Sequence, residues 1–209
     1  MIEIIDNAIQ LMVLVCCVIY VTILSLRHKG QVWFLLTCFY GSFALGMIHW
    51  LLFIVLYNDT PKISTVSDLS WLAGVLFLLV IQNTLRLPGE STYRPLMAWA
   101  APAFSTIMCL FFFQWGDYFL NILYAVLMGA CGYNALRGFM LSRRKRDNTG
   151  KRHYFHIVVL AFILVEYCLW VSSCFWGELD HLTPYFFFDF LLTFTFFTFL
   201  PTLKKVMEE

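Results

Sequence analysis

Seven long apolar segments constrain the fold of this chain more than any other feature of its sequence. A helix that crosses the hydrocarbon core of a bilayer needs about 20 mostly apolar residues. Seven segments have this length and composition, and they cover residues 8–26, 32–57, 68–87, 96–114, 117–141, 154–176 and 182–203. The chain is 61% hydrophobic and 13% charged, whereas a soluble domain is about half apolar and about one quarter charged. The sequence therefore predicts one all-α domain over residues 1–209, with seven transmembrane helices in a lipid bilayer.

The positions of the basic residues predict how these helices are oriented. Lys and Arg follow the first, third, fifth and seventh segments at Arg27, Lys29, Arg86, Arg94, Arg143, Arg144, Lys145, Arg146, Lys151, Arg152, Lys204 and Lys205. Of the 14 Lys and Arg residues, only Lys62 falls in a loop on the other side. Cytoplasmic loops are enriched in Lys and Arg, so we expect the N-terminus outside and the C-terminus in the cytoplasm.

The first ten residues, MIEIIDNAIQ, are acidic and lack both a basic region and a small-residue cleavage site. They are interpreted as part of a mature first helix rather than a cleaved signal peptide. We expect a multi-pass protein of the bacterial cytoplasmic membrane.

Two helical hairpins of the sequence resemble each other and predict an internal repeat. They are residues 46–86 and 166–203. Trp50 and Trp170 are each followed by a polar turn that contains a proline. Asp68 and Asp189 then come 18 and 19 residues after these tryptophans. We predict two parallel halves over residues 8–87 and 117–203, with residues 96–114 as a linker helix, as occurs in some transporters. Chance similarity between two apolar hairpins is the alternative.

Ionisable side chains inside the apolar segments are the main candidates for function. A charged group in hydrocarbon is costly, so each one is a functional hypothesis by default. Glu166 lies near the middle of the sixth segment, Asp189 about two turns into the seventh, and His49 in the outer half of the second. Several tryptophans share this outer half, so we expect these side chains to line a cavity that opens to the outside. The predicted ligand-binding residues are His49, Trp50, Asp68, Trp71, Glu166, Trp170 and Asp189.

Some of these residues are also typical of a structural role. Asp68 follows Ser and Thr residues at a helix start, where it would cap the helix. His49 would suit a hydrogen bond between helices. The 22 Phe residues are interpreted as packing and lipid-facing residues, and an aromatic face for a partner helix or a hydrophobic ligand is the alternative.

The densest basic run has two interpretations. It consists of Arg143, Arg144, Lys145 and Arg146. The run marks the cytoplasmic side and contacts anionic lipid headgroups, or it forms a docking surface for a protein partner. It is the candidate partner-binding site.

Other function classes lack their usual sequence signals. The net charge is +1, which provides no basic field for nucleic acid. The seven cysteines form no CxxC pair, and none has a histidine at zinc-finger spacing. The G-x-S-x-G and H-E-x-x-H motifs are absent. Residues 182–203 contain no lysine for a retinal pigment, and the prolines depart from the pattern of three-plus-one-plus-three sugar carriers. We therefore expect no metal, no cofactor and no nucleic-acid partner, and we do not favour an enzyme.

Two short motifs resemble a hairpin of known membrane proteins. They are residues 46–50 (GMIHW) and 67–74 (SDLSWLAG), separated by a spacer that contains Pro61. This pattern is similar to a hairpin in the N-terminal seven-helix sensor regions of bacterial signalling proteins, which precede histidine kinase or diguanylate cyclase modules. The resemblance implies a sensory function. The chain stops at Glu209, so we expect no output domain and signalling through a separate partner.

The leading hypothesis is a receptor-like or sensory membrane protein. It would bind a small or lipophilic ligand in the cavity, with Glu166 and Asp189 providing sensitivity to charge or protons and His49 as their partner. Three alternatives stay open: a small-solute or proton-coupled transporter that uses the same carboxylates, an intramembrane enzyme that acts on lipid or peptide, and a structural subunit of a membrane complex. A sensor would bind its ligand without flux, whereas a transporter would lose its flux in Glu166→Gln.

Overall fold

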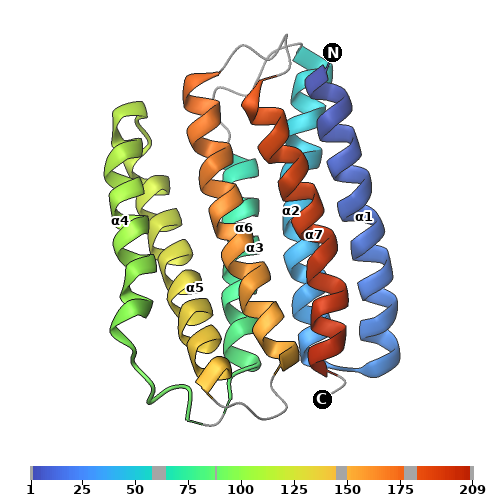
Figure 1. The fold of residues 1–209 in the computed structure, drawn as a ribbon. Helices are drawn as coiled ribbons and strands as arrows, with labels where there is room; N and C mark the ends of the chain where they lie inside the picture. The colour runs from blue at the N-terminus through green and yellow to red at the C-terminus, as the bar shows by residue number, and fades with distance from the viewer. Residues whose placement is uncertain (1, 58–64, 88, 145–149, 177–182, 208–209) are drawn as a thin grey trace.

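The computed structural model describes residues 2–57, 65–87, 89–144, 150–176 and 183–207. Its regular structure is helical throughout these residues (Figure 1), with α1 (Ile2–His28), α2 (Gln31–Tyr57), α3 (Thr65–Thr84), α4 (Ala100–Phe112), α5 (Tyr118–Arg144), α6 (Gly150–Phe175) and α7 (Pro184–Met207). Two 3₁₀ turns, η1 (Leu96–Trp99) and η2 (Phe113–Trp115), extend α4 at its ends. In this described part, seven helices are long and apolar enough to cross a membrane. The predicted all-α architecture with seven membrane-length helices is therefore confirmed.

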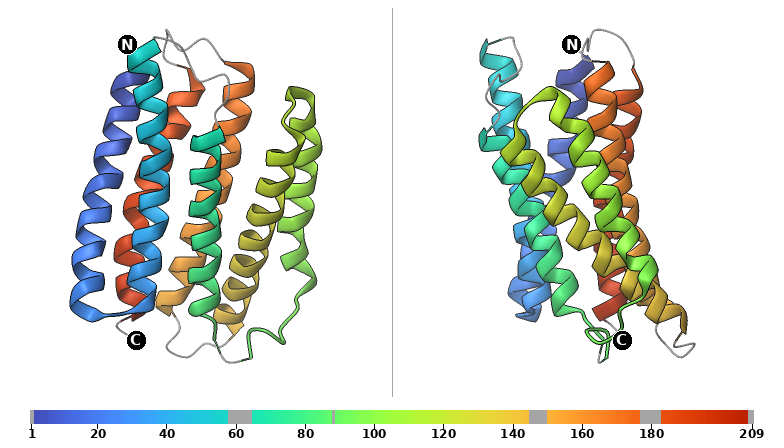
Figure 2. Two further views of the ribbon diagram at one scale, coloured as in Figure 1. Left: turned by 180° about the vertical axis from the view of Figure 1, so that it is seen from behind. Right: turned by 90° about the vertical axis from the view of Figure 1, so that its left-hand side faces the viewer.

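Six of the helices form a ring, and α4 lies outside it. Contacts join α1 to α2, α2 to α3, α3 to α5, α5 to α6, α6 to α7 and α7 back to α1, while α4 packs on α5. Figures 1 and 2 show α4 at the edge of the bundle and the two termini at opposite ends. These ends are called the N-terminal end and the C-terminal end of the bundle below.

The first helix begins earlier than the sequence predicts. Its predicted start is residue 8, whereas α1 begins at Ile2. Glu3 lies in the first turn, where a carboxylate interacts favourably with the positive end of the helix dipole. Asn7 and Gln10 are buried, so the polar face of α1 turns toward the other helices. The extension brings polar side chains into the bundle that the predicted helix left out.

A cluster of six aromatic side chains fills the ring near the middle of its helices. It consists of Phe39, Tyr40 and Phe43 of α2, Phe162 of α6, and Phe196 and Phe199 of α7, all of which are buried. The ring centroids of Phe43 and Phe196 are 4.9 Å apart, and those of Phe39 and Phe199 are 5.2 Å apart. These tilted and edge-on contacts are the geometry that aromatic pairs prefer. Tyr40 Oη donates a hydrogen bond of 2.7 Å to the Phe196 carbonyl. This cluster is called the aromatic plug.

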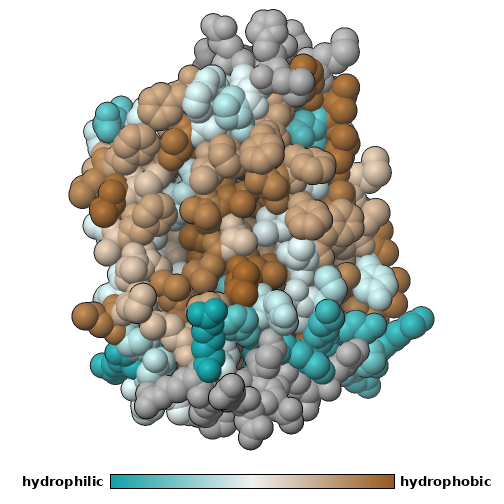
Figure 3. Space-filling view, viewed as in Figure 1, coloured by the Kyte–Doolittle hydropathy of each residue, from teal (hydrophilic) through white to brown (hydrophobic). Residues whose placement is uncertain are grey.

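The Phe residues of α7 divide between the core and the outer surface. Phe186, Phe196 and Phe199 are buried, whereas Phe187, Phe190, Phe194 and Phe197 are exposed. Figure 3 shows the exposed apolar side chains as a broad band, with hydrophilic side chains gathered beyond it at the C-terminal end. A band of this kind is the surface that a lipid bilayer covers. The Phe residues thus divide between packing inside the bundle, as predicted, and an exposed apolar band of the kind that a bilayer covers.

Candidate functional site

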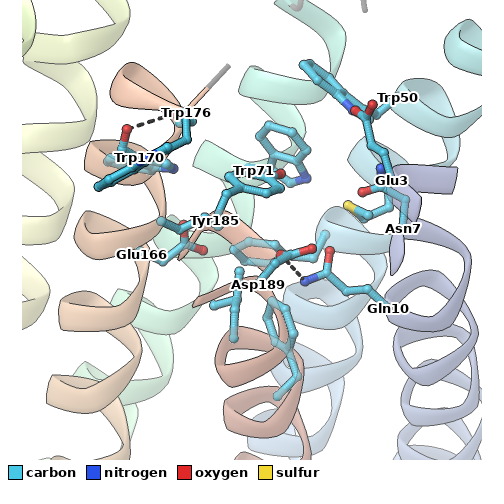
Figure 4. A pocket seen from close by; sticks show the side chains of 16 residues that line it. Glu3, Asn7, Gln10, Trp50, Trp71, Glu166, Trp170, Trp176, Tyr185 and Asp189 are labelled. Carbon is cyan, nitrogen blue, oxygen red and sulfur yellow. Dashed lines mark hydrogen bonds between the residues drawn. The ribbon is translucent and has the colours of Figure 1, made fainter. Parts of the chain in front are cut away.

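A cavity of about 210 Å³ lies inside the ring, toward the N-terminal end of the bundle. Side chains of α1, α2, α3, α6 and α7 form its wall, and Figure 4 shows the polar and aromatic ones. Phe43 and Phe196 line the cavity and also belong to the aromatic plug. The plug is therefore the floor of the cavity on the side of the C-terminal end.

Five of the seven predicted ligand-binding residues line this cavity, namely Trp50, Trp71, Glu166, Trp170 and Asp189. They come from four helices, α2, α3, α6 and α7. The ring brings them together because α2 and α6 end near the N-terminal end of the bundle, where α3 and α7 begin. The expected convergence of carboxylates and tryptophans is thus seen in the fold, while ligand binding there stays a prediction.

His49 lies outside the wall of this cavity. Its Nδ1 atom is 2.8 Å from Ser67 Oγ on α3, and Ser67 donates a hydrogen bond of 3.1 Å to the Gly46 carbonyl. Neighbouring residues of a helix point about 100° apart, so His49 faces α3 when Trp50 faces the cavity. The expectation that His49 is the partner of Glu166 and Asp189 is therefore corrected. His49 instead makes a hydrogen bond between helices.

Asp68 lies beside a second hollow of about 330 Å³. This hollow shares Trp50, Trp71, Trp170 and Ser173 with the cavity, so these side chains lie between the two spaces. Tyr124 Oη on α5 donates a hydrogen bond of 2.9 Å to the Asp68 carbonyl. Asp68 lies in the first turn of α3, where a negative charge interacts favourably with the helix dipole. It is not among the described residues that line the cavity with Glu166 and Asp189.

Gln10 of α1 binds the Asp189 carboxylate, and both residues are buried. Gln10 Nε2 donates a hydrogen bond of 2.9 Å to Asp189 Oδ1 (Figure 4). Asp189 Oδ2 is buried and receives no hydrogen bond from an amide or hydroxyl donor of the described residues. The Asp6 side chain of α1 also approaches this carboxyl group. Asp189 is therefore oriented by α1, and no basic side chain of the described residues pairs with it.

Glu166 has no partner of opposite charge among the residues that the structure describes. The residue is 5% exposed and its side chain lines the cavity near Tyr185 (Figure 4). Across the described residues, none forms an ion pair or a hydrogen bond with Glu166. The described wall contains Glu3, Glu166 and Asp189 but no lysine, arginine or histidine. A buried carboxylate without a counter-charge is unfavourable, so this one requires water, a proton or a bound cation.

Aromatic rings surround the carboxylates. They are Trp50, Trp71, Trp170, Trp176 and Tyr185 (Figure 4). The Trp50 indole lies beside the Glu3 side chain (Figure 4), and the Trp50 and Trp71 ring centroids are 6.0 Å apart. Gly46 permits this position of Trp71, because a Cβ atom on Gly46 would overlap the indole ring. The wall therefore combines negative charge with aromatic rings, whose π faces attract cations.

The side chains of α1 are the part of the site that sequence reasoning missed. Glu3, Asn7 and Gln10 line the cavity, and their spacing of i, i+4 and i+7 is that of one helical face. This periodicity in the first ten residues was the available signal. Trp176 and Tyr185 also line the cavity. In the sequence, their location at the expected outer ends of helices was the one signal for this role.

The polar residues at the C-terminal end make structural bonds. Arg137 and Glu90 form a buried ion pair of 3.6 Å, and Arg137 also donates a hydrogen bond of 3.0 Å to Asn134 Oδ1. Arg152 Nη1 donates a hydrogen bond of 2.8 Å to the Leu85 carbonyl. These bonds tie α5 and α6 to the segment that follows α3.

The predicted partner-binding run lies only partly within the described residues. Arg143 is exposed, and its guanidinium lies 4.9 Å from the centre of the Phe139 ring. Arg144 ends α5, but its side chain and residues Lys145 and Arg146 lie outside the described residues. The role of this run in docking a partner stays a prediction.

Within the described ranges, no group of three or more His, Cys, Asp or Glu side chains lies close enough together to hold a metal ion. The groups that the cavity offers are separated carboxylates, aromatic rings and side-chain amides. The chain matches no family model, no curated protein and no solved structure.

Proposed function

We propose that this chain is a receptor-like or sensory integral membrane protein that binds a small ligand in the cavity at the N-terminal end. One observation carries the proposal: two buried carboxylates, Glu166 and Asp189, share a cavity with a tryptophan-rich wall. Packing of helices does not require acidic groups at this depth, and their charge is costly in hydrocarbon. Concave apolar pockets with a few convergent polar groups are the usual form of a small-molecule site. A ligand that contacts both carboxylates accounts for their presence.

The proposed orientation has the N-terminal end outside the cell and the C-terminal end in the cytoplasm of a bacterium. Its support is the distribution of charge. Exposed basic residues gather at the C-terminal end, at Arg27, Lys29, Arg143, Lys151, Lys204 and Lys205. The N-terminal end carries Glu3, Asp6 and Asp117 instead. Because cytoplasmic segments are enriched in Lys and Arg, the cavity opens to the outside, and a signalling partner docks at the basic end.

The aromatic plug supports binding without passage. Its six buried rings lie between the cavity and the C-terminal end of the bundle. A transporter must expose its site to the second side of the membrane in each cycle. In a receptor the plug stays closed, and ligand binding changes the packing of α2, α6 and α7 around it.

One observation favours a transporter as the second candidate. The ring helices follow one another in the order α1, α2, α3, α5, α6 and α7, and α7 contacts α1. When each helix of the first half is exchanged with its counterpart in the second half (α1 with α5, α2 with α6, α3 with α7), the same pairs of neighbours result. For example, the contact of α1 with α7 becomes the contact of α5 with α3. This order agrees with two parallel halves, residues 8–87 and 117–203, with α4 outside the ring as the linker. Parallel repeats of this kind occur in transporters.

Cysteine labelling in intact cells tests the proposed orientation and the access to the N-terminal end of the bundle. The full chain is expressed with its seven native cysteines replaced by alanine, and Ser173→Cys introduces a thiol in the cavity wall. Lys204→Cys, at the other end of the bundle, is the control. We expect a membrane-impermeant maleimide to label position 173 in intact cells and position 204 only after permeabilisation. Labelling of 204 alone in intact cells, or no labelling of 173 under either condition, would contradict the proposal.

Proton flux separates the receptor from the transporter. The full chain is reconstituted in liposomes that contain a pH-sensitive dye, and a potassium diffusion potential is applied. The receptor predicts the same proton flux as protein-free liposomes. A proton-coupled transporter predicts a larger flux that Glu166→Gln abolishes, as expected for an intramembrane carboxylate that carries the coupling proton.

A further inference from the structure

We propose that the ligand of this cavity is a small organic cation, an ammonium group on a compact apolar body. The inference rests on the proposed function and adds the chemical class of the ligand to it. Three features of the cavity carry it: the sign of its charge, the nature of its walls and its size.

Among the residues that the structure describes, the charged side chains of the wall all have the same sign. Glu166 and Asp189 are at least nine-tenths buried, and both face the cavity. Among the described residues, Glu166 has no basic partner, and Asp189 contacts Gln10 and Asp6 but no basic side chain. Both groups are acidic, so a ligand with a positive charge and hydrogen-bond donors complements them better than a neutral ligand or an anion. A cation supplies the missing counter-charge, and an ammonium group supplies up to three hydrogen-bond donors.

The aromatic walls favour a cation with an organic surface. Trp50, Trp71 and Trp170 come from three different helices, and Tyr185 faces them from a fourth. Such rings attract cations through their π faces, and boxes of this type recognise ammonium groups. Their apolar surface also binds the hydrocarbon part of the ligand. An inorganic ion suits the site less well, because calcium, for example, takes about six to eight oxygen ligands, and the described carboxylates form no metal-binding group.

The volume sets the size of the ligand. The cavity measures about 210 Å³, whereas an engineered apolar protein cavity of about 150 Å³ takes up benzene. One aromatic ring with a short aminoalkyl arm therefore fits. Such a ligand would place its ammonium group between Glu166 and Asp189 and its ring against the tryptophans.

Tryptophan fluorescence of the purified full chain in lipid nanodiscs tests this proposal. The probes are 2-phenylethylammonium, the neutral 2-phenylethanol and the anionic phenylacetate, which share one ring and a similar length. We expect saturable binding of the cation with a Kd at least about tenfold below that of the alcohol, as one charge-assisted hydrogen bond provides. Phenylacetate should show no saturable binding.

Charge-removing variants connect the binding to named residues. Glu166→Gln and Asp189→Asn should each weaken binding of 2-phenylethylammonium about tenfold or more, and leave binding of 2-phenylethanol unchanged. Asp117→Asn is the matched control. It removes a carboxylate at the same end of the bundle but outside the cavity, and asparagine tolerates the positive φ of 44° at this position. This control should bind the cation as the unaltered chain does, and melting temperatures verify that each variant is folded.

The remaining outcomes overturn the cation assignment. Equal binding of the cation and the alcohol, preferred binding of phenylacetate, or no saturable binding of any probe would each do so. Loss of cation binding in Asp117→Asn to the same extent as in Glu166→Gln would also contradict it. Labelling of Ser173→Cys and the proton-flux assay do not depend on these probes, so together they test the proposed orientation and function separately.

Discussion

The side-chain amide of Gln10 donates a hydrogen bond of 2.9 Å to Asp189 and so joins the first helix of the bundle to the last. Both residues are buried. The bond lies where α1 meets α7, the contact that closes the ring of six helices. It therefore contributes to the fold and orients a carboxylate at the wall of the cavity.

Replacing Gln10 by leucine should destabilise the chain by about 1–3 kcal/mol, because a buried carboxylate oxygen loses its donor. Chemical unfolding in detergent micelles measures this change. The double variant Gln10→Leu, Asp189→Leu should be closer to the unaltered chain than the single variant, since both polar partners are then removed together. A double variant that is less stable than the single one would show that the hydrogen bond does not contribute as described.

Gly46 and Gly41 of α2 should respond differently to alanine. A Cβ atom on Gly46 overlaps the Trp71 indole, whereas a Cβ atom on Gly41 meets nothing within 4 Å. Gly46→Ala should therefore cost about 1–3 kcal/mol through overpacking and shift the tryptophan emission as Trp71 moves. Gly41→Ala should be neutral or slightly stabilising because alanine favours a helix. The same effect at both positions would contradict the close packing of α2 on α3.

The buried ion pair of Arg137 and Glu90 should be sensitive to loss of one partner. Glu90→Gln leaves the Arg137 charge buried and unpaired, so we expect a loss of about 3–5 kcal/mol in the free energy of unfolding. Replacing both, as Glu90→Leu with Arg137→Met, should restore much of this loss, since an apolar pair of similar volume needs no counter-charge. A Glu90→Gln variant as stable as the unaltered chain would mean that Arg137 has another counter-charge.

The aromatic plug should limit access to the cavity from the C-terminal end. Phe196→Ala removes a ring that belongs to both the plug and the cavity wall, at a cost of about 3–5 kcal/mol. In inverted membrane vesicles, it should let an impermeant maleimide reach Ser173→Cys. Phe194→Ala, on the exposed face of the same helix, should give no such access. Equal labelling without the Phe196 substitution would show that the plug is not a barrier.

The architecture follows from the sequence because length and apolarity are local properties. Each membrane-length helix has to satisfy its own backbone hydrogen bonds in hydrocarbon, so an apolar segment of sufficient length predicts a helix without knowledge of its neighbours. The predicted start of the first helix, residue 8, is too late because the prediction used local apolarity alone. Residues 2–7 include polar side chains that weaken an apolar window, although the other helices accept them on the inner face.

The candidate site follows from the sequence less completely, because it depends on how each helix is rotated about its axis. Glu166 and Asp189 were identified by their depth in apolar helices, where a charge needs a partner. His49 has a similar depth, but Trp50 takes the cavity-facing position of α2 and His49 bonds to Ser67. Both faces of α2 near this point are apolar, so hydrophobic periodicity could not decide between the two residues.

An experimental density map of the full chain in a lipid nanodisc, at side-chain resolution and with 2-phenylethylammonium present, tests the central claim most directly. The account predicts Glu166 and Asp189 on one space between α1, α6 and α7, with density in it that does not belong to the protein. A map in which Leu169 and Leu192 close this space, and each carboxylate turns to a protein neighbour of its own, would contradict it.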